Sequence, residues 1–353
     1  MHIAFVNSTR SWGGVKTWTL DYARELMQRG HRISAFVRQD VFHDRLREEG
    51  VSARLMTFGF DFNPLSILTF MAAFRADRPD VVVCNVKKDM NIGGMAAKFL
   101  GVPVIQRVGM PRDMEDDRGV AFLLKTIRPW MLGPSHTVAD GIRQHMPYFP
   151  EARIKVIHNA KHPAAAIRPV QPGPLRLIST SQVNKEKAHD QVLEALESFP
   201  AGSFRYDIVG TGSYMGTLRE RFRAMEERGD VVWHGFSTDV AGLLAQSDIF
   251  LLPSRSEGMP NALLEAMAAG LIPVSRDIGG VREIWPDTLA EFLVPLRGKA
   301  DEFRLRLERL FAMEPAQLDA LKEASLTACR TTFNLPRKID EFERWVRDEV
   351  IGG

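Results

Sequence analysis

Short apolar runs alternate with helical patterns along the first half of the chain. Residues 2–7, HIAFVN, predict a buried strand, and residues 17–30 predict an amphipathic helix that ends at Gly30. Near-continuous apolar strands that alternate with helices indicate a parallel sheet covered on both faces. The pattern predicts three further strands and one further helix in this half, at 32–37, 80–85, 103–108 and 93–101.

The alternation stops at residues 160–174, where four prolines and a glycine within fifteen residues predict a linker. It then resumes, with strands predicted at 175–180, 205–210, 231–235, 248–253 and 271–275. We therefore predict an α/β protein of two doubly wound domains, at residues 1–165 and 172–332. Ligands of such sheets bind beyond the carboxyl ends of the strands, so two facing domains would form a cleft for two substrates. Residues 333–353 contain a predicted amphipathic helix that could pack back on the first domain.

Composition narrows the class of protein. The 353 residues carry a formal charge of only +2, which gives no argument for a nucleic-acid partner. The two cysteines, Cys84 and Cys329, form no CxxC pair, as expected in a reducing compartment. The chain shows no signal-peptide pattern and no apolar run of ~18 residues, so we predict a cytoplasmic protein. Residues 58–75 are apolar and aromatic with a basic end; they could form a buried helix or touch a membrane surface, so peripheral membrane contact stays open.

The stretch SEGMPNALLE carries the strongest candidate chemistry. Glu257 lies in a predicted turn, and Glu265 lies about one turn inside a helix predicted at 261–270. A helix N-terminus suits phosphate, and a carboxylate one turn further along could accept hydrogen bonds from a diol such as a ribose. Glu257 would then reach groups on the other side of the phosphates. Glutamate near a helix start is also favoured by the helix dipole alone, so a purely structural role remains open.

Several segments, in order along the chain, resemble one known family. They are SWGGVKTWTLDYARELMQRGHRISAFV, IKVIHNAKHP, EKAHDQVLEAL and SDIFLLPSRSEGMPNALLEAMAAGLIPVSRDIGGVREI. The last is similar to the Glu-x7-Glu signature of the family-4 retaining glycosyltransferases, which have the GT-B fold of two facing Rossmann-like domains. The resemblance implies transfer of a sugar from a nucleotide-diphosphate sugar, with a UDP-sugar as the first expectation. The acceptor would be a glycan or a lipid-linked glycan in polysaccharide or lipopolysaccharide synthesis, with no metal or other cofactor.

The resemblance also implies residue roles. Lys187 would contact the donor diphosphate and Glu257 the transferred sugar, as the catalytic pair, and Glu265 would hold the ribose. The remaining donor contacts would come from Gly14, Gln182, Phe236, Ser237, Gly258, Met259, Pro260, Asn261 and Ala262. On the acceptor side we expect Gly13, Arg107 and Arg112, together with Lys88, which follows a strand end where an acceptor would lie; a solvated turn is the alternative for Lys88.

Two positions depart from the family pattern. Gln182 stands where the family usually has an arginine, which removes a charge beside the leaving diphosphate. Val108 stands where the family often has a histidine, so Arg107 or Arg112 could instead hold an anionic acceptor. The nine histidines are scattered and give no clear metal site; the closest pair, His158 and His162, flanks a loop.

Other classes of function stay open at this stage. Gly210, Gly212 and Gly216 resemble a dinucleotide fingerprint with one spacing too long, and a simple strand-to-helix turn is the alternative. The rivals to a glycosyltransferase are a GT-B epimerase, a nicotinamide-dependent oxidoreductase and a non-catalytic sensor of sugar nucleotides. The sequence does not specify the nucleotide base, the sugar, the acceptor, the linkage or the oligomeric state.

Overall fold

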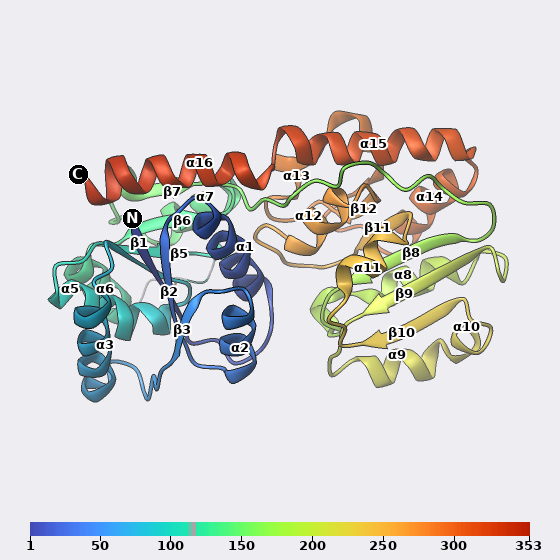
Figure 1. Ribbon diagram of the computed structural model, residues 1–353. Helices are drawn as coiled ribbons and strands as arrows, with labels where there is room; N and C mark the ends of the chain where they lie inside the picture. Colours follow the sequence, from blue (N-terminus) through green and yellow to red (C-terminus); the bar gives the residue numbers. More distant parts are fainter. Residues whose placement is uncertain (112, 114–117) are drawn as a thin grey trace. The chain divides into compact units, whose positions relative to one another are not determined.

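A computed structural model describes residues 1–111, 113 and 118–353 of the chain (Figure 1). Contacts divide the chain into two compact units, each with its own parallel sheet. The first unit comprises residues 1–159 and 335–353, and the second unit comprises residues 160–334. The chain therefore passes between the units twice, at 159/160 and at 334/335.

The sheet of the first unit has seven parallel strands in the order β3-β2-β1-β4-β5-β6-β7. Its central strands are mostly apolar because helices cover both faces, and every residue of β1 and β4 is buried. The strands are β1 (His2–Asn7), β2 (Arg32–Val37), β3 (Ser52–Leu55), β4 (Val81–Cys84), β5 (Val104–Arg107), β6 (Trp130–Gly133) and β7 (Ile154–Val156).

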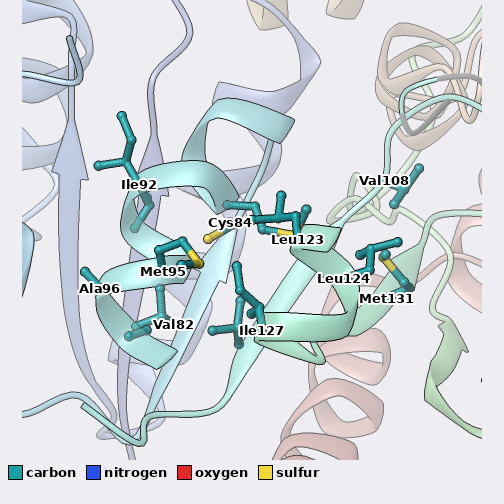
Figure 2. Packing of buried hydrophobic residues seen from close by; sticks show 14 of the residues in the cluster. Val82, Cys84, Ile92, Met95, Ala96, Val108, Leu123, Leu124, Ile127 and Met131 are labelled. Atoms are coloured by element: carbon teal, nitrogen blue, oxygen red, sulfur yellow. The ribbon is translucent and has the colours of Figure 1, made fainter. Parts of the chain in front are cut away.

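Helices cover both faces of this sheet. On one face, inward side chains of α3, α5, α6 and α7 join one buried cluster with β4, β5 and β6; Figure 2 shows Met95, Leu123 and Ile127 around Cys84. On the other face, Trp18 of α1 contacts Phe5, and Tyr22 contacts Phe342 of the C-terminal helix α16. The helices are α1 (Gly14–Gln28), α2 (Asp40–Glu48), α3 (Pro64–Asp77), α4 (Lys87–Asp89), α5 (Met95–Phe99), α6 (Arg118–Ile127), α7 (His136–His145) and α16 (Leu335–Trp345), with π-helical turns at Met90–Gly94 and Val346–Ile351.

The sheet of the second unit has six parallel strands in the order β10-β9-β8-β11-β12-β13. They are β8 (Leu175–Thr180), β9 (Phe204–Val209), β10 (Val231–Gly235), β11 (Ile249–Leu252), β12 (Ile272–Arg276) and β13 (Leu293–Val294). Its helices are α8 (His189–Leu196), α9 (Met215–Arg221), α10 (Arg223–Glu227), α11 (Val240–Ala245), α12 (Asn261–Ala268), α13 (Val281–Ile284), α14 (Ala300–Phe311) and α15 (Pro315–Thr331).

The prediction of two doubly wound parallel sheets is confirmed. The sequence pattern did not predict the short edge strands β3 and β7, because their residues are mostly not buried. In β3, the sequence SARL buries one residue, and in β7, IKV, none is fully buried. Residues 58–75 were predicted either to form a buried helix or to touch a membrane surface. In the structure Phe70 and Phe74 are buried, whereas Leu65 and Leu68 are exposed.

Strand order locates the candidate sites within each unit. In the first sheet the order reverses between β1 and β4, and in the second between β8 and β11. Ligands of doubly wound sheets bind at the carboxyl ends of the strands at such a reversal. In the second unit, the segments that leave β8 and β11 contain Lys187 and Glu257, so the fold brings the two predicted catalytic residues to one point. Within the described residues, every helix is too short or too polar to cross a bilayer.

Candidate active site

The turn between β11 and α12 presents Glu257 beside a helix N-terminus. Pro260 is the N-cap residue of α12 and makes no side-chain cap hydrogen bond, and the N-terminus of a helix is a favourable place for an anionic ligand. Gly258, Met259 and Pro260 are buried, so the turn is held by its surroundings.

Glycines on the following loop hold this turn in place. The Gly280 N–H donates to the Gly258 carbonyl over 2.6 Å. Gly279 has φ +52°, and a Cβ there would lie 2.1 Å from the Glu257 carbonyl oxygen. Only glycine fits such a close approach, so the DIGG segment fixes the backbone that carries Glu257. The sequence interpretation gave no role to these two glycines.

Lys187 meets Glu257 directly. Lys187 ends a 3-10 turn, Lys185–Lys187, in which the Asn184 side chain accepts the Lys187 N–H over 3.1 Å. Its Nζ lies 2.5 Å from Glu257 Oε1, and the two side chains are 22% and 15% exposed. The two predicted catalytic residues therefore form an ion pair across the reversal point of the second sheet.

Glu265 also pairs with a lysine. It lies on α12 after Leu264, and its Oε1 lies 2.8 Å from Nζ of Lys161, with side chains 27% and 10% exposed. Lys161 belongs to the segment predicted as a linker and was not among the expected site residues. Each glutamate of the signature thus has its own lysine, and the N-terminus of α12 lies between the two glutamates in sequence.

A buried polar network supports the loop that follows β8. The His189 ring lies 3.0 Å from Ser181 Oγ and 3.5 Å from the Tyr206 hydroxyl, which in turn lies 2.7 Å from Ser179 Oγ. Burial lowers the pKa of His189 to about 4, so the imidazole is neutral at neutral pH. Gln182, on the same loop, is exposed and accepts the Asn184 side-chain amide over 3.3 Å.

Close packing explains two glycines of the dinucleotide-like segment. A Cβ on Gly210 would lie 2.0 Å from the Ser181 carbonyl oxygen, and one on Gly212 would lie 2.1 Å from the Val183 carbonyl oxygen. These contacts allow the loop after β9 to pack against the loop after β8. A dinucleotide is not needed to account for either glycine.

The two residues expected near the base follow β10. Phe236 is 64% exposed, and the Ser237 hydroxyl accepts the Asp239 N–H over 3.1 Å. Asn261 and Ala262, expected beside the phosphates, open α12 and are half-buried.

The expected acceptor-side residues gather around the reversal point of the first sheet. Gly13 and Gly14 follow β1 and open α1, and Lys88 follows β4, with its Nζ 3.6 Å from Asp61 Oδ1. Arg107 ends β5, and Arg112 lies outside the described residues.

Arg107 is almost fully buried. Its guanidinium lies 4.7 Å from the centre of the Trp18 ring and 3.4 Å from Asn159 Oδ1, and burial lowers its pKa to about 10. Val108, next along the chain, belongs to the apolar cluster.

Asp89 connects the two loops of this region. Its carboxylate accepts backbone N–H groups of Ser8 over 2.7 Å, Val86 over 3.0 Å and Asn85 over 3.1 Å. The side chain is fully buried, and burial raises its pKa to about 7. A single carboxyl therefore ties the segment after β1 to the segment after β4.

The two parallel-sheet units are those of the GT-B fold. Over 99% of this chain the structure is similar to Anabaena Alr3699/HepE in complex with UDP-glucose, with a TM-score of 0.81, 15% sequence identity and all of that chain covered. At that identity the likeness establishes the fold.

Family models then cover both units of the chain. The Glycosyltransferase Family 4 model matches residues 12–162, and the model of Glycosyl transferases group 1 matches residues 165–326. The chain belongs to the family-4 glycosyltransferases, as the sequence motifs predicted.

Curated relatives match part of the chain. The amylovoran biosynthesis glycosyltransferase AmsK of Erwinia amylovora is 31% identical over 171 residues, which is 46% of this chain and 42% of AmsK. The UDP-Gal:alpha-D-GlcNAc-diphosphoundecaprenol alpha-1,3-galactosyltransferase of Escherichia coli is 28% identical over 145 residues, 41% of this chain and 37% of the relative. The chain thus spans about two fifths of the length of these two relatives.

Proposed function

We propose that this chain is a retaining glycosyltransferase that moves a sugar from a UDP-sugar to a glycan or lipid-linked acceptor in envelope polysaccharide synthesis. The observation that carries the proposal is the pairing of Lys187 with Glu257, which lies in the turn that leads to the N-terminus of α12. A cation and a helix N-terminus beside one turn are what a leaving diphosphate requires. Relatives named for UDP-glucose binding and for transfer to a diphosphoundecaprenol-linked sugar support the donor and acceptor classes.

The chemistry follows from this arrangement. The bond between the sugar anomeric carbon and the diphosphate oxygen breaks, and its electron pair goes to that oxygen. Lys187 and the amides of α12 stabilise the negative charge that develops there, while Glu257 faces the positive charge on the sugar. The acceptor hydroxyl oxygen then bonds to the anomeric carbon on the face that the diphosphate leaves, and its proton goes to the departing phosphate. Glu265 would hold the ribose diol through its carboxylate.

This proposal assigns no step to a metal or a redox cofactor. In this proposal Lys187 and the N-terminus of α12 are the groups that contact the diphosphate. The absence of a metal requirement is a prediction, which activity after exhaustive chelation would test.

A binding and turnover panel tests the function. Thermal unfolding is measured with UDP, GDP, ADP, CMP, NAD and the sugar conjugates, because a ligand of the native state raises its stability. The proposal expects stabilisation by UDP or a related nucleoside diphosphate, release of that nucleotide when an acceptor is added, and an unchanged anomeric configuration by NMR.

The rivals predict different outcomes in this panel. An epimerase would convert the donor without an acceptor. A sensor would bind the nucleotide and turn over no acceptor. A nicotinamide-dependent oxidoreductase would respond to NAD and not to UDP, and an inverted product would overturn the retaining mechanism.

A further inference from the structure

A cavity of about 370 Å³ lies on the second unit, beyond the carboxyl ends of β12 and β13. Its volume falls within the range of small-molecule sites, roughly 300–1,000 Å³. The sequence interpretation assigned none of its lining residues to the donor or the acceptor. The lining includes three apolar and three charged side chains, which are Trp285, Pro286, Leu296, Asp277, Arg282 and Asp287. We call this space the β12–β13 cavity.

A buried arginine fixes the part of the lining that follows β13. Arg276, the last residue of β12, donates through Nη1 to the Leu296 carbonyl over 3.0 Å and also to the Gly298 carbonyl. The Asp277 N–H donates to the Val294 carbonyl over 2.8 Å. The Leu296 side chain is nevertheless 59% exposed. This loop is therefore held in place by its backbone while its leucine side chain remains available to a ligand.

The tryptophan of the cavity is also fixed. Trp285 Nε1 donates to the Leu289 carbonyl over 2.8 Å, which satisfies the indole N–H and holds the ring in one orientation. The side chain packs against the core of the unit and is only partly buried. An aromatic ring that is fixed before the ligand arrives offers apolar contact at a low cost in conformational entropy.

The charged side chains leave carboxylate oxygens for a ligand. Arg282 donates to Asp277 Oδ2 through Nε, over 3.1 Å, and through Nη2, and no described residue bonds to Oδ1. The Asp287 side chain is exposed and forms no ion pair or hydrogen bond with any described residue. The lining thus carries two carboxylates and one guanidinium that is already paired. The exposed Arg297 is next to Leu296 in sequence but does not line the cavity.

A neutral saccharide unit matches this combination of groups. One face of a pyranose ring presents C–H groups that pack on an aromatic ring, and the hydroxyls at its rim donate to carboxylate oxygens. A wholly apolar ligand would desolvate the charged side chains and give them no hydrogen bonds. A phosphate would meet the two carboxylates, and like charges brought together are unfavourable.

We propose that the β12–β13 cavity binds a neutral saccharide unit, which stacks on Trp285 and donates hydrogen bonds to Asp287. Asp277 also opens the DIGG segment, whose Gly279 and Gly280 hold the turn of Glu257. A sugar bound there lies beside that segment and is a different unit from the one that the donor carries. Binding to the cavity requires neither the donor nor the proposed transfer reaction.

Saturation-transfer difference NMR on the full chain tests this proposal. The probes are methyl glucoside, methyl galactoside and N-acetylglucosamine, each with saturating UDP present, and glucose 6-phosphate and adenosine are compared with them. We expect weak binding of at least one neutral sugar, with weaker binding of glucose 6-phosphate. Asp287→Ala should lower the affinity by about tenfold and Leu296→Ser by about threefold.

Matched controls lie elsewhere on the same unit. Glu220→Ala removes an exposed carboxylate of α9, and Leu305→Ser removes an exposed leucine of α14; both should bind sugars as the wild type does. All four substituted side chains are exposed, so the unfolding temperature should stay unchanged. The proposal is overturned by absent binding of every neutral sugar, or by binding that both cavity variants retain. Preferential binding of adenosine or glucose 6-phosphate would contradict it as well.

An independent observation, at the start of the second unit, concerns Lys161. Besides its ion pair with Glu265, its backbone N–H donates to the Phe333 carbonyl over 3.1 Å, and residue 161 bridges to Asn334. The Cys329 thiol lies 3.6 Å from its carbonyl oxygen. Contacts from the end of the unit thus fix the backbone of Lys161, whose ammonium is paired with the signature glutamate.

We infer that Lys161 is a positioning residue for Glu265. A fixed ammonium that occupies one carboxylate oxygen orients the group and leaves its other lone pairs for two sugar hydroxyls. The inference rests on the proposed function, since it assumes that Glu265 holds the donor ribose.

A double-mutant cycle on UDP affinity tests the role of Lys161. We expect Lys161→Met to weaken UDP binding by about tenfold with kcat little changed, and Lys161→Arg to restore much of the affinity. Because Lys161 acts through Glu265, Lys161→Met/Glu265→Gln should bind no more weakly than Glu265→Gln alone. Lys185→Met, which removes an exposed lysine of the same unit, is the control.

The outcomes separate this role from the proposed function. Additive losses in the double variant, or wild-type affinity in Lys161→Met when Glu265→Gln binds weakly, would overturn the role of Lys161 alone. If the wild type bound no nucleoside diphosphate, the proposed function would fail instead.

Discussion

Replacing Glu257 by glutamine should tighten UDP binding while it lowers turnover. Lys187 is engaged by Glu257 over 2.5 Å, so it must leave or share that partner to reach a diphosphate. Glu257→Gln keeps the shape of the side chain and removes the competing charge. The sign of the effect on affinity is opposite to that expected for a simple donor-binding residue.

The magnitude follows from the exposure of the pair. Both side chains are less than a quarter exposed, so the pair is worth more than a fully solvated one but remains screened. We take about 1 kcal/mol, at the top of the range for exposed pairs. Release of that interaction corresponds to about fivefold tighter binding of UDP. Lys187→Met removes a charged hydrogen-bond donor to the diphosphate, worth about 1.5–3 kcal/mol, and should weaken binding by about 10- to 150-fold.

Isothermal titration calorimetry with UDP, at one fixed salt concentration, measures both changes, and donor turnover is followed in parallel. Glu186→Gln is the matched control, because it removes an exposed carboxylate next to Lys187 in sequence. If Glu257→Gln bound UDP like the wild type or more weakly, while Lys187→Met lost affinity, Lys187 would not exchange between Glu257 and the donor. If Glu186→Gln tightened UDP binding equally, the effect would come from the local net charge and not from release of Lys187 from Glu257.

Three further predictions concern the loops after β8 and β9 and the start of α8. Gln182→Arg restores the cation usual in the family and should tighten UDP binding by about tenfold in the same titration; unchanged affinity would place residue 182 away from the diphosphate. Gly212→Ala forces a methyl group against the Val183 carbonyl and should destabilise the protein by about 2 kcal/mol in thermal unfolding, whereas Gly216→Ala, with nothing within 4 Å, should not. The pKa of His189 is about 4 in the folded protein and about 6.5 in the unfolded chain, so its contribution to stability is complete above pH 6.5. Up to about 3 kcal/mol of that stability is lost as the pH falls toward 4. The free energy of unfolding, measured in urea at several pH values, should depend less on pH for His189→Gln than for the wild type, and equal slopes would contradict the assignment.

Much of the fold was predictable because it depends on local pattern. Buried parallel strands such as β4 and β11 are apolar at every position, a pattern typical of strands that are covered on both faces. Edge strands such as β3 have little buried surface, so their sequences carry no such pattern. The signature glutamates were found by their spacing, because a helix fixes the separation between its N-terminus and Glu265.

The partners of those glutamates could not be predicted in the same way. Lys161 lies in a proline-rich segment with no periodicity, and its position depends on contacts with residues near 329–334. Lys187 and Glu257 were each expected at the donor, but their mutual ion pair depends on how two loops from different strands pack. For Gly210 and Gly212 the sequence suggested a dinucleotide fingerprint, whereas the structure accounts for both glycines by close packing, which only the three-dimensional structure reveals.

The two lysine–glutamate pairs have a consequence for which anions the proposed site would bind. Lys187 and Lys161 are each already neutralised by a carboxylate, so these four side chains together carry no net charge. Inorganic phosphate would have to displace a carboxylate at a single lysine and would gain no contact with Glu265. A nucleoside diphosphate can do both at once, with its phosphates at Lys187 and its ribose at Glu265. With the proposed roles of Lys187 and Glu265, the site would discriminate against the small anions that are abundant in cells, and UDP titrations repeated in phosphate buffer should show little competition.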